Sequence, residues 1–269
     1  PQVPFFQDLE IRRALMMGID RQRIITQLND GQATLAHGPV FPGSWAYYDG
    51  VEKIEYDPEG AINILRAAGY SIPASGTPVR TDEDGQSLSF DLVYPQDEKN
   101  EQLAAAIAAD WEVLGVQANL EPVDADLLLE DHLDPREYQA ALVEINLTRS
   151  PDPDPYPFWD QAQITGGQNY SQWNDRQASE YLEQARVELD RSERMRLYNN
   201  FQVRFSSELP ALPLFYQIYN YGIDQRVNGV TIGSLYQPSD RFAEVIKWFL
   251  LAERSLEPAP TVIDNTPTP

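Results

Sequence analysis

The sequence predicts an α/β fold, and the clearest sign of it is the segment 88–122. Apolar side chains alternate with mostly polar ones over 88–94, which is typical of a strand with one buried face. The next apolar residues recur on one helical face, at Leu103, Ile107, Trp111 and Leu114. A second alternating stretch starts at Val116, directly after Gly115. A strand, a helix and a strand of these lengths predict two parallel strands joined by a right-handed crossover.

The same succession of helix and strand continues beyond this unit. A short helix is expected near 125–133, and a further strand near 138–147. Together these elements predict a mixed or parallel sheet that is flanked by helices.

The N-terminal part supplies helices to cover such a sheet. A helix is expected over 8–28, because Ile11, Leu15 and Ile19 form an apolar stripe at four-residue spacing. Asp20 should interrupt it and cap a second, shorter helix. A further helix is expected over 56–70, with Asp57 as its cap.

The C-terminal part is predicted to be mainly helical. One apolar stripe consists of Ala178, Leu182, Ala185 and Leu189, and another of Leu197, Phe201 and Phe205. An extended apolar run follows at 213–223. The end of the chain, from residue 253 on, is rich in Pro and Thr and reads as a disordered tail or linker.

The composition limits the kinds of partner that the protein can have. Apolar residues make up 42% and aromatic residues 11% of the 269 residues, which favours a folded chain over a disordered one. The formal net charge of -22 repels phosphate backbones, so no nucleic-acid partner is expected. The same charge weakly favours cationic ligands.

Several kinds of chemistry are also excluded or disfavoured. The chain has no cysteine, so disulfides, thiolate nucleophiles and zinc–thiolate sites are ruled out. His37 and His132 are far apart and are expected to be ordinary loop or surface residues, and no cofactor or metal is predicted. No apolar run reaches the roughly 20 residues that cross a bilayer. The start at Pro1, without a visible signal peptide, favours a processed chain or a piece of a longer protein.

The segment 150–175, SPDPDPYPFWDQAQITGGQNYSQWND, stands out from the rest. Its prolines restrict the backbone and would pre-organise the loop. It can be a surface loop whose aromatic rings pack on the core. Asp152, Asp154 and Asp160 could also form a glycosidase-like carboxylate pair or bind a divalent ion, but no second carboxylate cluster accompanies them.

Six motifs along the chain follow one another in an order that is known from one family. They are IRRALMMGIDRQRII, GPVFPGSWAYY, YDPEGAINILRAAGY, WEVLGVQANL, PDPDPYPFW with NYSQWND, and ERMRLYNNFQVRFSSELPALPLFY. Over residues 5–250 the sequence therefore resembles the C-terminal half of ABC-transporter extracellular solute-binding proteins of the oligopeptide/dipeptide-binding type, family 5. Each motif is weak alone, but chance matches rarely keep their order.

This resemblance implies a periplasmic-binding-protein-like lobe. Residues 1–222 would form the ligand-binding lobe, 223–252 a returning segment packed on the lobe or hinge, and 253–269 the tail or linker. Such receptors have two lobes that close on the ligand by a hinge, and the N-terminal lobe is missing from this sequence. The implied partners are that lobe, a peptide or other small solute, and an ABC permease in the membrane.

The implied role is non-enzymatic capture of a solute for import, outside the cytoplasmic membrane, in a periplasmic or cell-surface protein that is membrane-anchored at full length. In peptide-binding members of the family, an aspartate in the Asp-Pro-Asp loop pairs with the α-ammonium group of the ligand. The matching residue here is Asp152, with Asp154 as the second choice. The full set of implied ligand-binding residues is Asp152, Asp154, Trp159, Asn169, Tyr170 and Trp173, of which the aromatic ones would wall the pocket. A lobe reused as a sensor or scaffold module is the alternative.

Overall fold

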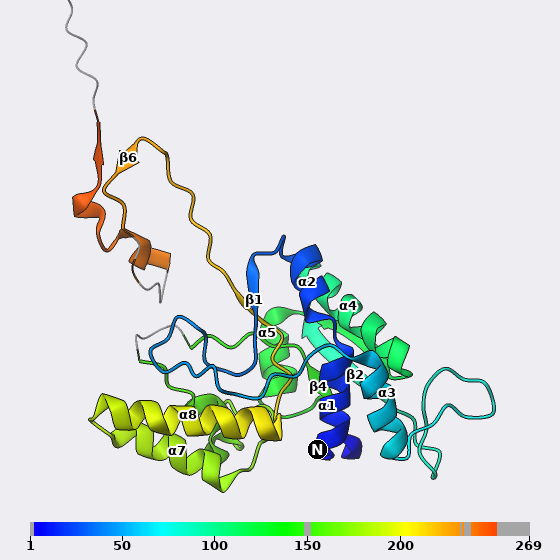
Figure 1. Ribbon diagram of the computed structural model, residues 1–269. Helices are drawn as coiled ribbons and strands as arrows, with labels where there is room; N and C mark the ends of the chain where they lie inside the picture. Colours follow the sequence, from blue (N-terminus) through cyan, green and yellow to red (C-terminus); the bar gives the residue numbers. More distant parts are fainter. Residues whose placement is uncertain (1–2, 148–151, 232, 234–237, 252–269) are drawn as a thin grey trace, which may run out of the picture. The chain divides into compact units, whose positions relative to one another are not determined.

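The computed structural model describes residues 3–147, 152–231, 233 and 238–251. The chain divides into two compact units, Pro1–Asn220 and Tyr221–Pro269, and each is described by itself. Within the first unit, Figure 1 shows an α/β part and a pair of long helices.

The α/β part is built on a three-stranded sheet in the order β3-β2-β4. Its strands are β2 (Ser89–Pro95), β3 (Gln117–Val123) and β4 (Ala140–Ala141). Both neighbours run parallel to β2, and helix α4 (Glu98–Leu114) connects β2 to β3. The predicted parallel strand–helix–strand unit is thereby confirmed.

Local residues define both ends of helix α4. The Asp97 carboxylate accepts a hydrogen bond from the Asn100 amide at 2.9 Å, which satisfies a free N–H of the first turn. Gly115 follows the helix with a φ of 78°, and a Cβ there would lie 3.0 Å from the Pro78 carbonyl oxygen. Glycine is therefore required by both the backbone conformation and the lack of space.

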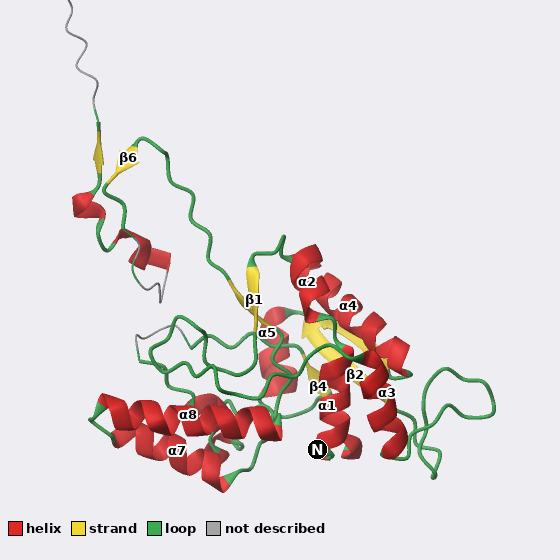
Figure 2. Cartoon of the chain, in the orientation of Figure 1, coloured by secondary structure: helices red, strands yellow, loops and turns green. Residues whose placement is uncertain are grey.

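Helices cover the sheet on one face (Figure 2). They are α1 (Leu9–Gly18) and α3 (Pro58–Ala67), together with α4, and they are preceded by the short 3₁₀ turn η1 (Pro4–Gln7). Helix α2 (Arg21–Leu28) follows α1, and the Asp20 and Asp57 side chains cap α2 and α3 as predicted. The main apolar core lies between these helices and the alternate residues Leu88, Phe90, Leu92 and Tyr94.

The other face of β2 is also covered, which the strand pattern did not show. Val93 is only 2% exposed, because Leu128 and Leu133 pack against it. Both leucines belong to η2 (Leu128–Leu133), a π-helical turn that continues α5 (Ala125–Leu127). The helix predicted near 125–133 is confirmed.

The strand predicted over 138–147 is wrong for most of its length. Only Ala140 and Ala141 pair with β2, opposite Leu92 and Val93. Further along, Ile145 packs on a second apolar cluster. Beyond Ala141 the chain therefore leaves the sheet, and Ile145 contributes to the other core.

The second apolar cluster belongs to the two long helices, α7 (Arg176–Val187) and α8 (Arg191–Glu208). The short helix α6 (Tyr156–Trp159) and the 3₁₀ turn η3 (Gln161–Gln163) precede them. The predicted stripes are buried here, except that Leu189 is 95% exposed. It lies in the turn between the two helices, where no neighbouring element can cover it.

Two strands far apart in the sequence pair with each other. Strand β1 (Ala33–Leu35) is antiparallel to β5 (Phe215–Gln217), with Leu35 opposite Phe215. The extended run at 213–223 was predicted, but its partner was not.

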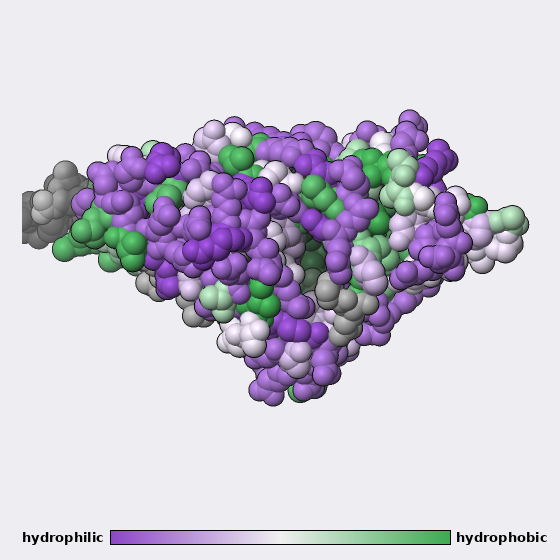
Figure 3. Space-filling view, turned by 90° about the horizontal axis from the view of Figure 1, so that it is seen from below, coloured by the Kyte–Doolittle hydropathy of each residue, from purple (hydrophilic) through white to green (hydrophobic). Residues whose placement is uncertain are grey.

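The second unit contains the antiparallel pair β6 (Val227–Asn228) and β7 (Phe249–Leu250), with the 3₁₀ turns η4 (Pro238–Phe242) and η5 (Val245–Lys247) between them. The packing predicted for 223–252 stays a prediction, and the tail 253–269 lies outside the described residues. Among the helices that the structure describes, none combines the length and the apolar character needed to cross a membrane. Hydrophilic side chains predominate on the face drawn in Figure 3, in keeping with the net charge.

Candidate functional site

The loop formed by residues 150–175 connects the α/β part to the α7–α8 pair in the sequence. Its first two residues, 150 and 151, lie outside the described part of the chain, so it is followed from Asp152 onward. Contacts with the two long helices hold both ends of the loop, and contacts with the turn after η2 hold its middle.

Two arginines of the long helices bind the two leading aspartates. A carboxylate oxygen of Asp152 accepts a hydrogen bond from Arg194 of α8. A carboxylate oxygen of Asp154 lies 3.1 Å from Arg186, in the last turn of α7. The hydrogen bond to Asp152 raises the pKa of Arg194. The Asp152 and Asp154 side chains are 46% and 40% exposed, although the Oδ1 atom of Asp152 is itself buried.

These groups surround a pocket of about 160 Å³. Its lining consists of Asp152, Pro153, Asp154, Arg186, Arg194 and Tyr198. The Tyr198 hydroxyl donates to the Pro153 carbonyl at 2.8 Å, which holds the backbone between the two aspartates. Burial raises the pKa of Tyr198, so the hydroxyl remains a donor at neutral pH. The volume suffices for a small functional group or a few water molecules.

The aromatic ring of Trp45 packs against residues that line this pocket. The guanidinium groups of Arg191 and Arg194 lie 4.9 Å and 5.4 Å from its ring centroid. Tyr198 meets the same ring edge to face at 5.8 Å. Such stacking keeps the arginine side chains in place.

Trp159 and Trp173 take part in the second apolar core. Trp159 is 5% exposed and meets Phe205 edge to face at 4.8 Å. Trp173 is half-buried, and its ring centroid lies 6.3 Å from that of Phe201 and 6.0 Å from that of Phe205. Their aromatic rings thus attach the loop to α8.

Asn169 holds the loop together from within and is fully buried. Its amide nitrogen donates to the carbonyl oxygens of Asp160 and Trp173, at 3.0 Å and 2.9 Å. Its amide oxygen accepts from the Ser171 hydroxyl and the Trp173 amide. Asp160 is fully buried as well, accepts from the Ala162 amide at 2.7 Å, and has a pKa that burial raises.

Tyr170 lies further along the loop, near the turn after η2. The guanidinium of Arg136 lies 4.8 Å from its ring centroid, and the Tyr138 hydroxyl donates to its carbonyl oxygen. Arg136 also donates to the carbonyl oxygens of Ile164 and Gly167, at 3.0 Å and 2.7 Å. This turn therefore holds the middle of the loop.

The structure places two of the six predicted residues, Asp152 and Asp154, in one pocket. The other four support the loop through the second core, its internal hydrogen bonds and the turn at Arg136. Sequence reasoning missed Arg186, Arg194 and Tyr198. No local pattern could have found them, because Asp152 and Arg194 are 42 residues apart and meet only through tertiary packing.

The described residues offer no alternative site of a metal-binding kind. No three His, Asp or Glu side chains among them are grouped as metal ligands would be. His132 contacts the Glu137 carbonyl oxygen at 3.1 Å. His37 is partly buried, and burial lowers its pKa.

Comparisons with known proteins place this architecture among its relatives. Residues 1–169 match the sequence model described as bacterial extracellular solute-binding proteins, family 5 middle. The oligopeptide-binding protein AppA of Bacillus subtilis (strain 168) is 25% identical over 248 residues, which are 91% of this chain and 44% of AppA. The dipeptide-binding protein of Escherichia coli (strain K12) is 26% identical over 234 residues, 85% of this chain and 41% of that protein.

The structural comparison agrees with these matches. The structure of AppA from Bacillus subtilis in complex with a nonapeptide aligns with a TM-score of 0.76 at 24% identity. The alignment covers 93% of this chain and 49% of that one, so the two share a fold over this part. The chain spans less than half the length of the two curated relatives.

Proposed function

Because this chain belongs to the bacterial extracellular solute-binding proteins of family 5, we propose that it is the ligand-binding lobe of the substrate-binding component of an ABC importer. The lobe captures a peptide or similar small solute outside the cytoplasmic membrane, for delivery to a membrane permease. The relatives described as oligopeptide- and dipeptide-binding support a peptide ligand. The share of those relatives that the chain spans supports a second lobe that completes the receptor.

The observation that carries the proposal is the position of Asp152. Its carboxylate is on a loop that is held at both ends, beside a pocket of about 160 Å³, and its side chain is 46% exposed. A carboxylate in such a place recognises a primary ammonium group through a charge-assisted hydrogen bond. The α-ammonium of a peptide is the matching ligand group, and Asp154 is the second candidate for it.

The same geometry supports a binding protein rather than a glycosidase. A glycosidase needs one protonated acid beside one ionised carboxylate. Asp152 and Asp154 both form ion pairs with arginines, so neither carboxylate lies in the apolar surroundings that a general acid needs. Asp160 is fully buried in the loop, where a sugar cannot reach it.

Calorimetry on the full-length protein tests the role of Asp152. Trialanine should bind at least tenfold more tightly than N-acetyl-trialanine, and Asp152→Asn should remove most of this difference, as expected for a lost charge-assisted hydrogen bond of about 1.5–3 kcal/mol. Asp131→Asn is the control, since it removes the same charge from an exposed position on η2. Unchanged binding by Asp152→Asn would show that this residue does not contact the ammonium.

The need for a second lobe is tested separately. The isolated chain should bind the same peptide far more weakly than the full-length protein, because one lobe buries only one face of the ligand. Equal affinity of the two would remove the argument for a closing cleft.

A further inference from the structure

Arg194 is bound to the carboxylate that a ligand ammonium would need. Its guanidinium forms an ion pair with Asp152. The Arg194 side chain is 21% exposed, against 46% for Asp152, so solvent reaches the pair mainly from the aspartate side.

Other contacts keep Arg194 in position independently of Asp152. The Nε atom donates to the Ala185 carbonyl at 3.0 Å, at the end of α7. The guanidinium also lies 5.4 Å from the ring centroid of Trp45. If the Asp152 carboxylate rotated away, Arg194 would keep these partners. Because the Pro153 carbonyl is held by Tyr198, the backbone next to Asp152 stays in place during such an exchange.

The charges of the pocket balance one another. Asp152 and Asp154 contribute two negative charges, and Arg194 and Arg186 contribute two positive ones. An approaching cation therefore meets no net local attraction, despite the acidity of the whole chain. A guanidinium beside Asp152 also repels an ammonium that seeks the same carboxylate.

We propose that Arg194 is a built-in counter-ion of Asp152, which a primary ammonium group must displace, and that Arg194 thereby sets the charge selectivity of the loop. The inference rests on the proposed function for the identity of the loop as a ligand site. While it is paired with Asp152, Arg194 weakens the binding of simple cations to that carboxylate. A ligand gains access when its remaining contacts offset the loss of the Asp152–Arg194 pair.

The test uses a simple ammonium probe, so that it does not depend on the right peptide. The full-length protein is labelled with 5-fluorotryptophan, and the resonance of Trp45, identified by its loss in Trp45→Phe, is followed during titration with n-butylammonium chloride. Arg194→Gln should bind the probe about fivefold more tightly than wild type, as expected from removing one positive charge a few ångströms away.

Arg191→Gln is the matched control. Arg191 stacks on the same Trp45 ring at 4.9 Å, but within the described part of the chain it forms no ion pair. It should leave probe binding within about twofold of wild type, since it does not compete for Asp152. Arg194→Lys keeps the positive charge and should also bind the probe as wild type does.

Each remaining outcome decides against the proposal. Equal probe binding by Arg194→Gln and Arg191→Gln, weaker binding by Arg194→Gln, or no response at all would overturn it. So would an Arg194→Lys protein that behaves like Arg194→Gln. If Arg194→Gln does not fold, Arg186→Gln frees Asp154 in the same way and should tighten probe binding about threefold, while no change would overturn the proposal.

The outcome is separable from that of the proposed function. If the probe results hold while neither wild type nor Arg194→Gln binds trialanine, the charge selectivity stands and the peptide assignment falls. If trialanine binds through Asp152 while Arg194→Gln and Arg191→Gln bind the probe alike, the reverse is true.

Discussion

The first unit contains two cores that are stabilised in different ways. The core of the α/β part is made of aliphatic and aromatic side chains, with Phe90 packed against Phe5, Phe6 and Trp111. Arg21 and Arg80 are buried beside this core and donate to backbone carbonyl oxygens. The core around α7 and α8 also includes aromatic rings, and more buried polar groups accompany it. These are Ser44, Asp160, Asn169, Ser179, Gln202 and Ser206.

The difference shows how the protein supports an irregular loop. Apolar burial is non-directional and stabilises regular elements whatever their detailed side-chain partners. Hydrogen bonds are directional and specify one arrangement of a loop. The candidate site lies on the part that relies on directional bonds, so a loop of unusual shape can still be held in one conformation.

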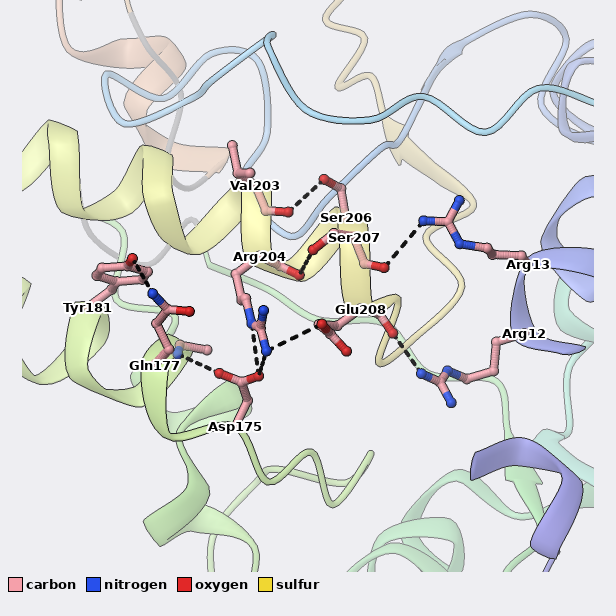
Figure 4. A network of polar contacts seen from close by, with 11 residues as sticks. Arg12, Arg13, Asp175, Gln177, Tyr181, Val203, Arg204, Ser206, Ser207 and Glu208 are labelled. Atoms are coloured by element: carbon pink, nitrogen blue, oxygen red, sulfur yellow. Dashed lines mark hydrogen bonds and ion pairs between the residues drawn. The ribbon is translucent and has the colours of Figure 1, made fainter. Parts of the chain in front are cut away.

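Arginines of α1 join the two parts (Figure 4). The Arg12 guanidinium donates to the carbonyl oxygens of Glu208 and Leu209, at 2.8 Å and 3.0 Å, at the end of α8. It also donates to the carbonyl oxygens of Phe6 and Gln7. Arg13 bonds to Glu52 and to the Ser207 carbonyl oxygen. The end of α8, where Leu209 has a φ of 47°, is thereby closed by side chains from the other part.

The largest effect should come from Phe90→Ala in the apolar core. Phe90 is 1% exposed, so the substitution should lower the free energy of unfolding by about 3–5 kcal/mol through lost burial and a residual cavity. Urea unfolding followed by circular dichroism measures this. Val113→Ala, on the exposed side of α4, should lose less than about 0.5 kcal/mol. A small loss at Phe90 would contradict the view that apolar burial dominates this core.

The next largest effect is expected at the junction, from Arg12→Met. The change leaves four carbonyl oxygens without their donor, two of them at the end of α8, and should lower the free energy of unfolding by about 2–4 kcal/mol. The same urea experiment applies. Arg196→Met is the control, because Arg196 is 59% exposed and, among the described residues, forms an ion pair only with Glu193 on the surface of α8. If both variants lose equally little, Arg12 does not join the two parts.

A smaller loss of stability is expected from Gln202→Leu in the core around α7 and α8. Gln202 is 2% exposed, donates to the Ala46 carbonyl at 2.8 Å and accepts from the Tyr48 amide at 3.2 Å. Leucine leaves these groups unpaired, which should lower the free energy of unfolding by about 1–3 kcal/mol. It should also change Trp45 fluorescence, because the segment around Ala46 and Tyr48 loses its contacts with Gln202. Gln177→Leu, at an exposed position of α7, should do neither. An unchanged or more stable Gln202→Leu protein would show that this core is as tolerant as the apolar one.

The smallest effect should appear in the pH dependence of Asp160→Asn. Burial raises the pKa of Asp160, so the folded state binds the proton more tightly than the unfolded state does. The contribution is therefore fully present below the ordinary aspartate pKa and is lost as the pH rises through the raised value. Asparagine removes this loss while keeping the acceptor for Ala162, so the variant should gain about 1 kcal/mol or less on the wild type as pH rises from 3 to 7. Parallel pH profiles of the two proteins, from urea unfolding at each pH, would contradict the assignment.

Local patterns were enough to predict the α/β part. Alternation around Phe90, the apolar stripe of α4 and the caps Asp20 and Asp57 each depend on a few neighbouring residues. The order of six motifs pointed to the family, and the family match supports it. These properties can be predicted from the sequence because helix and strand periodicity and capping depend on residues that are close together in the chain.

Only the tertiary structure decided which groups meet around the loop. It paired β1 with β5, ended the third strand after Ala141, and brought Arg194 to Asp152. None of these contacts has a local signal, since each depends on how elements far apart in the sequence pack. The sequence by itself determined the fold class and marked the loop, whereas packing decided that its aspartates already have counter-ions.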